Sequence, residues 1–426
     1  MTAIAGVLNK HGIAIAADSA VTFGNTHKVV NNGNKIFTLS KYAPVGIATY
    51  GRLSLMSTPW DIVIKQYRKQ LGEKRYSHLC EYVEDFFSYI KTNLYFTDDL
   101  VQHTLVQDYI TLFQRKVDEK VKVRCSQVPG KDYSVCLKEC LNEFIGVFGK
   151  PEIVCPEFSD YSYEDFIKYA NIELNTAFSS FHVAPQPDLF DLFSHSLFCY
   201  LRNGNRMGNG ELIPLFTSGL VFFGYGEDDL YPSVISKETS IVFDGHLKYC
   251  DGEGCVIGDH DSAASVIPYA QIDVTQTIVR GIHPGFYDIL SRSFIRVLQD
   301  YSSLIIETIN KNNPELTGLK NAITKLQLAP LARQFNDMAS SEFQRLYTQP
   351  LIQTVVNLDK EDMANMAESF VSLTSLIRRM SPGEETVGGP VDVAFVSKGD
   401  GFIWIKRKFY FKPELNYHFL ENYFKS

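Results

Sequence analysis

The first fifty residues alternate short apolar runs with polar turns, which is typical of β-strands. Residues 3–8 and 13–17 form the first pair of such runs, and the polar stretch 9–12 between them predicts a tight hairpin. Two further runs rich in β-branched residues follow at 35–39 and 45–49. The chain therefore opens with a β-rich segment.

The period of the apolar positions changes at Ser54, where a helical pattern begins. Two helices are expected between Ser54 and Leu94. Further helical segments, separated by Pro and Gly residues, are expected at 100–123, 135–148, 163–181 and 188–201. A block of helices therefore interrupts the strands.

Strands and helices then alternate along the rest of the sequence. Strands are expected at 219–225, 233–236, 240–243 and 246–249, and again at 391–397 and 401–407. Helices are expected within 273–310, 316–357 and 360–379. Because strand groups at both ends and in the middle are separated by helices, we expect an α+β fold whose sheets are assembled from distant segments.

This order of elements divides the chain into five segments. Residues 1–94 are expected to form the first half of a core, and residues 358–426 its last helix and strands. Residues 214–290 are expected to supply the central strands and a helix. Residues 95–213 and 291–357 are interpreted as two helical insertions into that core.

Composition and charge exclude several classes of partner. The formal net charge is −8 and the isoelectric point is near 5.7, so the chain has no general attraction for nucleic acid or anionic lipid. The most apolar later stretch, 212–224, contains a proline and is too short to span a bilayer. We expect neither a nucleic-acid partner nor a membrane partner.

Cysteine usage points to the cytoplasm. The eight cysteines are scattered, and the first apolar run is interrupted by polar residues, which makes it a poor secretory signal. This pattern is typical of reduced thiols inside the cell. The spacing of Cys250 and Cys255, close to Asp259 and His260, differs from that of a structural zinc site. We expect no metal and no cofactor.

The candidate chemistry begins at Thr2. A small residue after the initiator methionine favours removal of Met1, which would leave Thr2 with a free α-amine beside its own hydroxyl. A hydroxyl nucleophile activated by an N-terminal amine is a known arrangement for covalent hydrolysis. We therefore expect Thr2 to be the catalytic nucleophile.

Three further residues complete this candidate site. A free α-amine has a pKa near ~8, which suits a general base. Lys35 opens the third strand and is a candidate for the cation that lowers this pKa, with Asp18 as its partner. A backbone N–H after the fourth strand, in the turn that contains Thr49, is a candidate donor to the oxyanion.

At these residues the sequence resembles the start of a proteasome β-type subunit. The matching positions include Thr2, Gly6, Gly12, residues 16–19 and residues 35–37. The segment Thr22–Thr26 also resembles the bacterial heat-shock-locus peptidase HslV. The resemblance continues at residues 222–236, and again at residues 359–379 and 388–393.

The resemblance implies an N-terminal nucleophile (Ntn) hydrolase fold. Its expected architecture is a four-layer αββα sandwich, here with an inserted helical region. It also implies that Thr2 is both nucleophile and base, that Lys35 and Asp18 support it, and that Thr49 offers its N–H to the oxyanion. Ile47 falls at the position that shapes the substrate pocket in this family.

The supporting motif near the C-terminus departs from the family pattern. Glu384 takes the place of an aspartate, Val387 replaces a serine, and Gly388 opens the Gly-Gly turn. Glu384 and Gly388 are therefore the expected second layer behind Thr2. The replacement at Val387 removes a hydroxyl that in the family lies near the threonine amine.

The resulting expectation is a threonine peptidase that hydrolyses peptides or unfolded proteins through Thr2. Two alternatives stay open: a catalytically inactive structural or assembly subunit of the same fold, and an amidase that acts on a small amide. The resemblance also implies assembly into a homo-oligomer or ring and an ATP-dependent unfoldase as partner. The sequence itself leaves the assembly state open.

Overall fold

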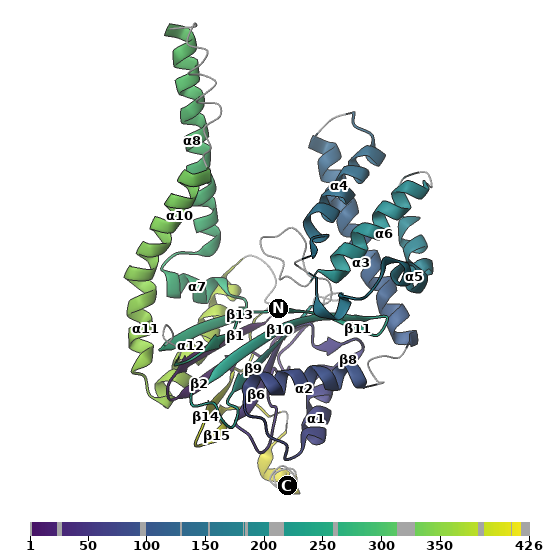
Figure 1. The fold of residues 1–426 in the computed structure, drawn as a ribbon. Coiled ribbons are helices and arrows are strands. Elements are labelled where there is room, and N and C mark those ends of the chain that lie inside the picture. Colours follow the sequence, from purple (N-terminus) through teal and green to yellow (C-terminus); the bar gives the residue numbers. More distant parts are fainter. Residues whose placement is uncertain are drawn as a thin grey trace. The chain divides into compact units, whose positions relative to one another are not determined.

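The computed structural model describes most of the chain. The described residues are 2–23, 28–93, 99–127, 130–151, 154–181, 183, 186–203, 217–258, 263–312, 329–381, 387–409 and 411–418. They form a mixed α/β structure with many helices and two large sheets that contain antiparallel strand pairs (Figure 1). The coarse fold class expected from the sequence is therefore confirmed.

The first sheet has five strands in the order β13-β1-β2-β14-β15. Its strands are β1 (Ala3–Asn9), β2 (Gly12–Ala17), β13 (Ala264–Ala270), β14 (Asp392–Ser397) and β15 (Gly401–Lys406). β1 pairs antiparallel with β2 on one side and with β13 on the other. The N-terminal strand therefore lies inside the sheet, with both backbone edges hydrogen-bonded.

Two helices pack on the first sheet. α12 (Lys360–Met380) covers small side chains of β1 and β2, and α11 (Gln349–Val356) packs on β13 and β1. The small residues come from alternate strand positions, and Met363 and Phe370 of α12 pack against them. The buried Asn9 amide also donates to Val355 O and Leu358 O, both at 2.9 Å, which fixes the link between the two helices.

The second sheet has six strands, in the order β11-β10-β9-β6-β5 with β12 paired to β10. Its strands are β5 (Ile36–Thr38), β6 (Val45–Gly51), β9 (Ser218–Gly224), β10 (Ser233–Phe243), β11 (His246–Asp251) and β12 (Cys255–Val256). The helices α1 (Trp60–Leu71) and α2 (Leu79–Thr92) share a large apolar cluster with these strands. A single aromatic-rich core therefore stabilises this sheet and its helices.

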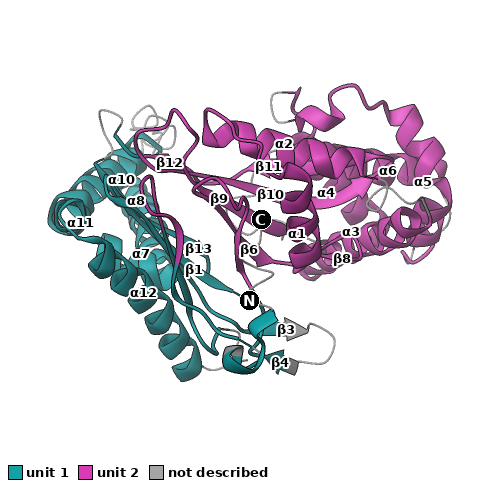
Figure 2. Ribbon diagram, turned by 90° about the horizontal axis from the view of Figure 1, so that it is seen from below, with its two compact units in different colours: residues 1–33, 257–395, 404–426 teal, residues 34–256, 396–403 magenta. Residues whose placement is uncertain are grey.

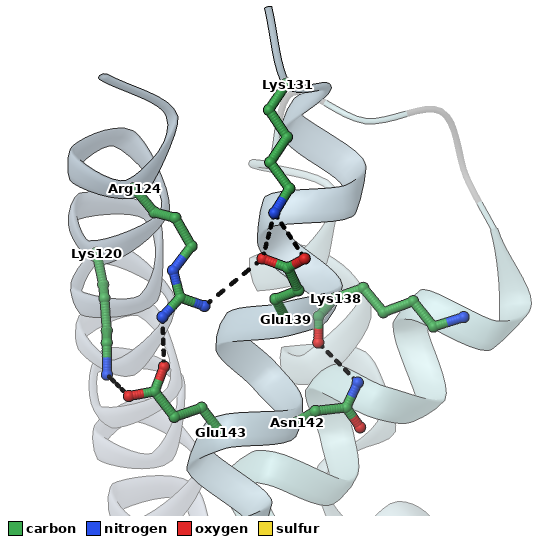
Figure 3. Close-up of polar contacts among 7 residues, drawn as sticks. All are labelled: Lys120, Arg124, Lys131, Lys138, Glu139, Asn142 and Glu143. Carbon is green, nitrogen blue, oxygen red and sulfur yellow. Dashed lines mark hydrogen bonds and ion pairs between the residues drawn. The ribbon is translucent and has the colours of Figure 1, made fainter. Parts of the chain in front are cut away.

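A block of four helices extends this core. It consists of α3 (Asp99–Gln127), α4 (Tyr133–Phe148), α5 (Tyr163–Phe178) and α6 (Pro187–Arg202). Between α3 and α4, Glu143 accepts from Lys120 at 3.0 Å and from Arg124 at 2.6 Å, and Glu139 accepts from Lys131 (Figure 3). These half-exposed charges hold two helices whose facing sides are apolar.

The remaining helices lie in the same unit as the first sheet. They are α7 (Asp273–Arg280), α8 (Pro284–Asn312), α10 (Ala329–Phe343) and the π-helical turn η4 (Gln344–Thr348). α8 and α10 lie side by side and form a long helical hairpin (Figure 1). The smaller elements are β3 (Val21–Phe23), β4 (Lys28–Val30), β7 (Ser54–Leu55), β8 (Thr58–Pro59), η3 (Pro156–Phe158) and η5 (Pro413–Leu415).

The chain folds into two compact units, shown in different colours in Figure 2. Unit 1 comprises residues 1–33, 257–395 and 404–426, and unit 2 comprises residues 34–256 and 396–403. α3 to α6 fall within the helical insertion expected at 95–213. The division at residues 33 and 34, however, falls inside the segment 1–94, which the order of elements predicts to be one continuous part of the core.

Within the described part of the chain, no helix combines the length and the apolar character that a membrane span requires.

Candidate active site

Thr2 directly precedes β1, which lies between β13 and β2 in the first sheet. Its side chain is buried, with 3% of its surface exposed. The carbonyl of Thr2 accepts a hydrogen bond from Gln271 N at 3.2 Å, just beyond the end of β13. On the other side, the next N–H of the chain, that of Ala3, donates to Asp18 Oδ1 at 2.9 Å. The peptide that joins Thr2 to Ala3 is therefore fixed from both neighbouring strands.

Asp18 is the centre of this arrangement. It directly follows β2, and 1% of its surface is exposed. Besides Ala3 N, its carboxylate accepts from Ala20 N and from Gly388 N, each at 3.1 Å. A buried carboxylate is stable when several N–H groups satisfy it. Asp18 thus joins the start of β1, the end of β2 and the turn before β14.

Ser19 strengthens the same junction. Its N–H donates to Gly388 O at 3.1 Å, and its hydroxyl donates to Pro390 O at 2.5 Å. Gly389 between these two residues has φ +74, and a Cβ there would lie 2.8 Å from Asn31 Cβ. Only glycine fits this turn without strain. Gly388 and Ser19 therefore both contribute to the junction around Asp18, and no role for Ser19 was predicted from the sequence.

A strained residue lies opposite Ala3. Ala270, its partner in the pairing of β1 with β13, has φ +66, a conformation that L-residues rarely adopt. This distortion ends β13 and turns the N–H of Gln271 toward Thr2 O. Strain of this kind persists only where the surrounding structure enforces it, and it clusters at functional sites. This strain could not be predicted from the sequence, because an alanine does not indicate a left-handed backbone.

Lys35 and Thr49 lie in unit 2, whereas Thr2 and Asp18 lie in unit 1. Within its own unit, Lys35 is buried, with 1% of its surface exposed. Its carbonyl accepts the N–H of Thr49 at 2.8 Å, as part of the pairing of β5 with β6. The two residues that the sequence analysis treated as cation and oxyanion donor are thus neighbours in one sheet.

This pairing removes Thr49 as the expected oxyanion donor. Its N–H is already engaged by Lys35 O, so it is not directed at a substrate. Its hydroxyl Oγ1 is buried and has no hydrogen-bond partner among the described residues. An ordinary ladder bond in an antiparallel sheet therefore takes the place of the expected catalytic contact.

The structure gives Ile47 a packing role in place of the expected substrate-pocket role. Its side chain is completely buried and belongs to the apolar cluster that β6 shares with α1 and α2. A side chain enclosed in such a core stabilises the fold and offers no surface to a ligand. The pocket role came from the position of Ile47 in the family resemblance, whereas its β-branched, apolar side chain is typical of a buried strand position.

The structure describes only some of the residues that were expected to support Thr2 from behind. Glu384 lies outside the described residues. Val387 is completely buried in the cluster beneath β1 and α12, and its carbonyl accepts from Ser375 Oγ at 3.3 Å. Val387 therefore contributes to packing, while Gly388 provides the polar contact with Asp18.

Among the described residues, no group of three or more His, Cys, Asp or Glu side chains is placed to hold a metal ion. A cavity of about 660 Å³ does lie in unit 2 beside α1 and α2, lined by Thr58, Gln66, Gln70 and Asn93 among others. Its lining holds one charged group, Lys69, and includes no carboxylate, histidine or cysteine. Thr2 and Asp18 therefore form the candidate catalytic site.

Comparisons with known proteins add little to this site. No family model and no curated protein matches the chain. Among the solved structures that match is the Anbu (Gly-1) mutant from Hyphomicrobium sp. strain MC1, with 7% identity over 99% of this chain and 95% of that chain. Its TM-score of 0.27 is too low to support an argument about fold or function.

These findings correct the family resemblance drawn from the sequence. Membership of the proteasome β-type and HslV-like family was expected from short motifs around Thr2, Asp18 and Lys35, but no family model matches the chain. Short runs of small and apolar residues at strand ends recur in many sheets, so they are weak evidence of common descent.

Proposed function

We propose that this protein is a threonine-type hydrolase that cleaves peptide bonds, with Thr2 as the nucleophile. The observation that carries the proposal is the fixed peptide between Thr2 and Ala3, bonded to Asp18 on one side and to Gln271 on the other. A nucleophile must be held in a defined place relative to its substrate, and a buried strand end achieves this. The strained Ala270 beside it supports the same assignment.

The proposed reaction requires cleavage of the bond between Met1 and Thr2, which exposes the Thr2 amine. Thr2 Oγ attacks the carbonyl carbon of a substrate amide while its proton passes to the Thr2 amine. The tetrahedral intermediate then expels the substrate amine, which receives that proton. Water, deprotonated by the Thr2 amine, hydrolyses the remaining ester and restores the hydroxyl.

The proposed roles of Asp18 and Lys35 are supported by different kinds of evidence. Asp18 is a positioning residue, because its carboxylate holds Ala3 and the turn at Gly388. Lys35 is proposed to supply the positive charge that lowers the pKa of the Thr2 amine, and this role rests on the sequence alone, since Lys35 belongs to the other unit. The proposal also includes the four-layer αββα arrangement expected for an Ntn hydrolase.

The substrate is proposed to be a peptide or an unfolded protein, with an ATP-dependent unfoldase as a partner that would supply such chains. A small amide is the alternative substrate. Turnover of a peptide library, compared with turnover of simple amides, distinguishes the two.

The decisive variant is Thr2→Ala, which removes the nucleophilic oxygen. We expect peptide turnover to fall at least ~10³-fold, the scale on which loss of an activated nucleophile acts. Thr2→Ser keeps a hydroxyl and should retain measurable turnover. Thr374→Ala is the matched control, because Thr374 is also buried in unit 1 but donates its hydroxyl to Phe370 O within α12. Full activity of Thr2→Ala would refute the proposal.

A further inference from the structure

The hairpin of α8 and α10 has one packed seam. The rings of Phe294 and Phe335 stack with centroids 4.3 Å apart, and those of Tyr287 and Phe343 meet at 5.5 Å. These pairs run in opposite chain directions, so the two helices are antiparallel. Tyr287 Oη also donates to Asn336 Oδ1 at 3.1 Å. Each helix therefore packs one apolar face against the other helix.

A second apolar stripe on α8 faces solvent. Its members have large exposed fractions: Phe286 58%, Leu290 40%, Val297 63%, Tyr301 62% and Leu304 59%. An amphipathic helix normally turns such a stripe toward a core. Among the described residues of α10 none is buried either, so this two-helix arm leaves much of its apolar surface in water.

The spacing of the stripe is symmetric about Val297. Leu290 and Leu304 lie seven residues before and after it, while Ser293 and Tyr301 lie four residues before and after it. Phe286 and Thr308 extend the stripe by eleven residues in each direction. Ser293 and Thr308 are exposed like their apolar neighbours. When such a helix is rotated by 180° about an axis perpendicular to it at Val297, each position of the stripe falls on another position of the stripe.

We propose that α8 docks against α8 of a second copy of this chain, antiparallel, with the two-fold axis at Val297. In this register Leu290 faces Leu304 of the second copy, and the small Ser293 faces the large Tyr301 of the second copy. Phe286 likewise faces the smaller Thr308 of the second copy. Side-chain volumes are thus complementary at each level, which close packing requires.

Parallel pairing fits these residues less well. It would place Tyr301 against Tyr301 and Ser293 against Ser293, so that crowded levels would alternate with empty ones. The two hairpins would instead form an antiparallel four-helix bundle, in which each α8 packs on its own α10 and on the second α8.

Charge and area agree with a second copy as the occupant. α8 carries three acidic residues, Asp288, Asp300 and Glu307, and three basic ones, Arg292, Arg296 and Lys311. This balance selects neither an acidic nor a basic partner and allows self-association. The five exposed apolar side chains offer roughly 500 Å² per copy, which is close to the apolar share of an interface of about 800 Å² per partner.

The test compares Val297→Asp with Gln299→Asp by light scattering and sedimentation of the full chain. Val297→Asp places two carboxylates against each other at the axis, so we expect the mass to fall by half and the dissociation constant to rise at least ~100-fold. Gln299→Asp adds the same charge on the same helix, at an exposed position outside the stripe. It should leave the mass unchanged. Circular dichroism confirms that both variants are folded.

A crosslink tests the register. In Val297→Cys the two introduced thiols face each other, and a short bismaleimide should join two chains in high yield relative to the unmodified protein. In Leu290→Cys they lie about 21 Å apart along the helices and should not be joined. A wild-type chain that is monomeric at high concentration overturns the proposal. So does a mass unaffected by Val297→Asp, or equal crosslinking of both cysteine variants.

Discussion

Asp18 connects three distant parts of the sequence through one carboxylate. It accepts N–H groups from Ala3, Ala20 and Gly388, and the last of these lies 370 positions away from Asp18. The sequence predicted that Asp18 is an acid at a strand end, but with the side chain of Lys35 as its partner. The backbone donors could not be foreseen, because any residue except proline carries an N–H and only the fold decides where it points.

The first residue-scale prediction is that Asp18→Asn destabilises the protein. The asparagine amide can keep one acceptor oxygen, but its NH₂ group would then face N–H groups that need an acceptor. The free energy of unfolding should fall by about 2 kcal/mol, measured by urea denaturation. Asp160→Asn, at an exposed position, should change it little. An unchanged stability of Asp18→Asn would show that the carboxylate does not hold these strands.

The second prediction concerns the strained backbone of Ala270. Replacing it with glycine removes the left-handed penalty at φ +66, partly offset by the greater freedom of glycine in the unfolded chain. Ala270→Gly should therefore stabilise the protein by about 0.5–1 kcal/mol. Ala264→Gly, in the same strand, should destabilise it by a similar amount. Thermal unfolding compares the two, and destabilisation by Ala270→Gly would contradict the strain.

At the scale of elements, the sequence predicted most helices and strands from their apolar periods. α4 and α6 were expected within two residues of their observed ends. β13 was not expected, because Pro268 lies in its middle and a proline argues against a strand. The strand tolerates it because β13 is at the edge of its sheet. β10 is one strand of 11 residues where two were expected, since Lys237 to Thr239 looked like a polar break.

Lys248 connects β11 to α6, and this contact predicts how stability changes with pH. Its Nζ donates to Tyr200 O, at the end of α6, at 2.6 Å and lies 4.5 Å from the centroid of the Tyr200 ring. Burial lowers the pKa of Lys248 from 10.5 to about 8. Below pH 8 the lysine is protonated in both states, and the folded state bears the cost of burying the charge.

As the pH rises from about 8 to 10.5, the folded lysine loses its proton while the unfolded chain keeps it. The unfolded state then binds more protons, so the contribution of Lys248 to stability increases with pH. The difference in free energy of unfolding between wild type and Lys248→Met should shift in favour of wild type by up to about 3 kcal/mol across this range. Urea denaturation at pH 7.5, 9 and 10.5 measures it, and a constant difference would contradict the lowered pKa.

At the scale of the whole molecule, each unit is assembled from segments far apart in the sequence. Unit 1 joins the N-terminal hairpin to residues after 257, and unit 2 contains the long helical block. The sequence indicated that distant segments build the sheets, because strands occur at both ends and in the middle. It could not reveal the division at residues 33 and 34, since no proline-rich or glycine-rich linker marks it.

The proposed reaction depends on Thr2 being a free N-terminal nucleophile. The most direct test is intact mass spectrometry of the purified chain before and after treatment with a β-lactone probe, followed by peptide mapping. We predict a chain that lacks Met1 and gains one probe mass, located on Thr2, with no gain in Thr2→Ala. A chain that retains Met1, or whose Thr2 stays unmodified while the probe reacts elsewhere, would contradict the account.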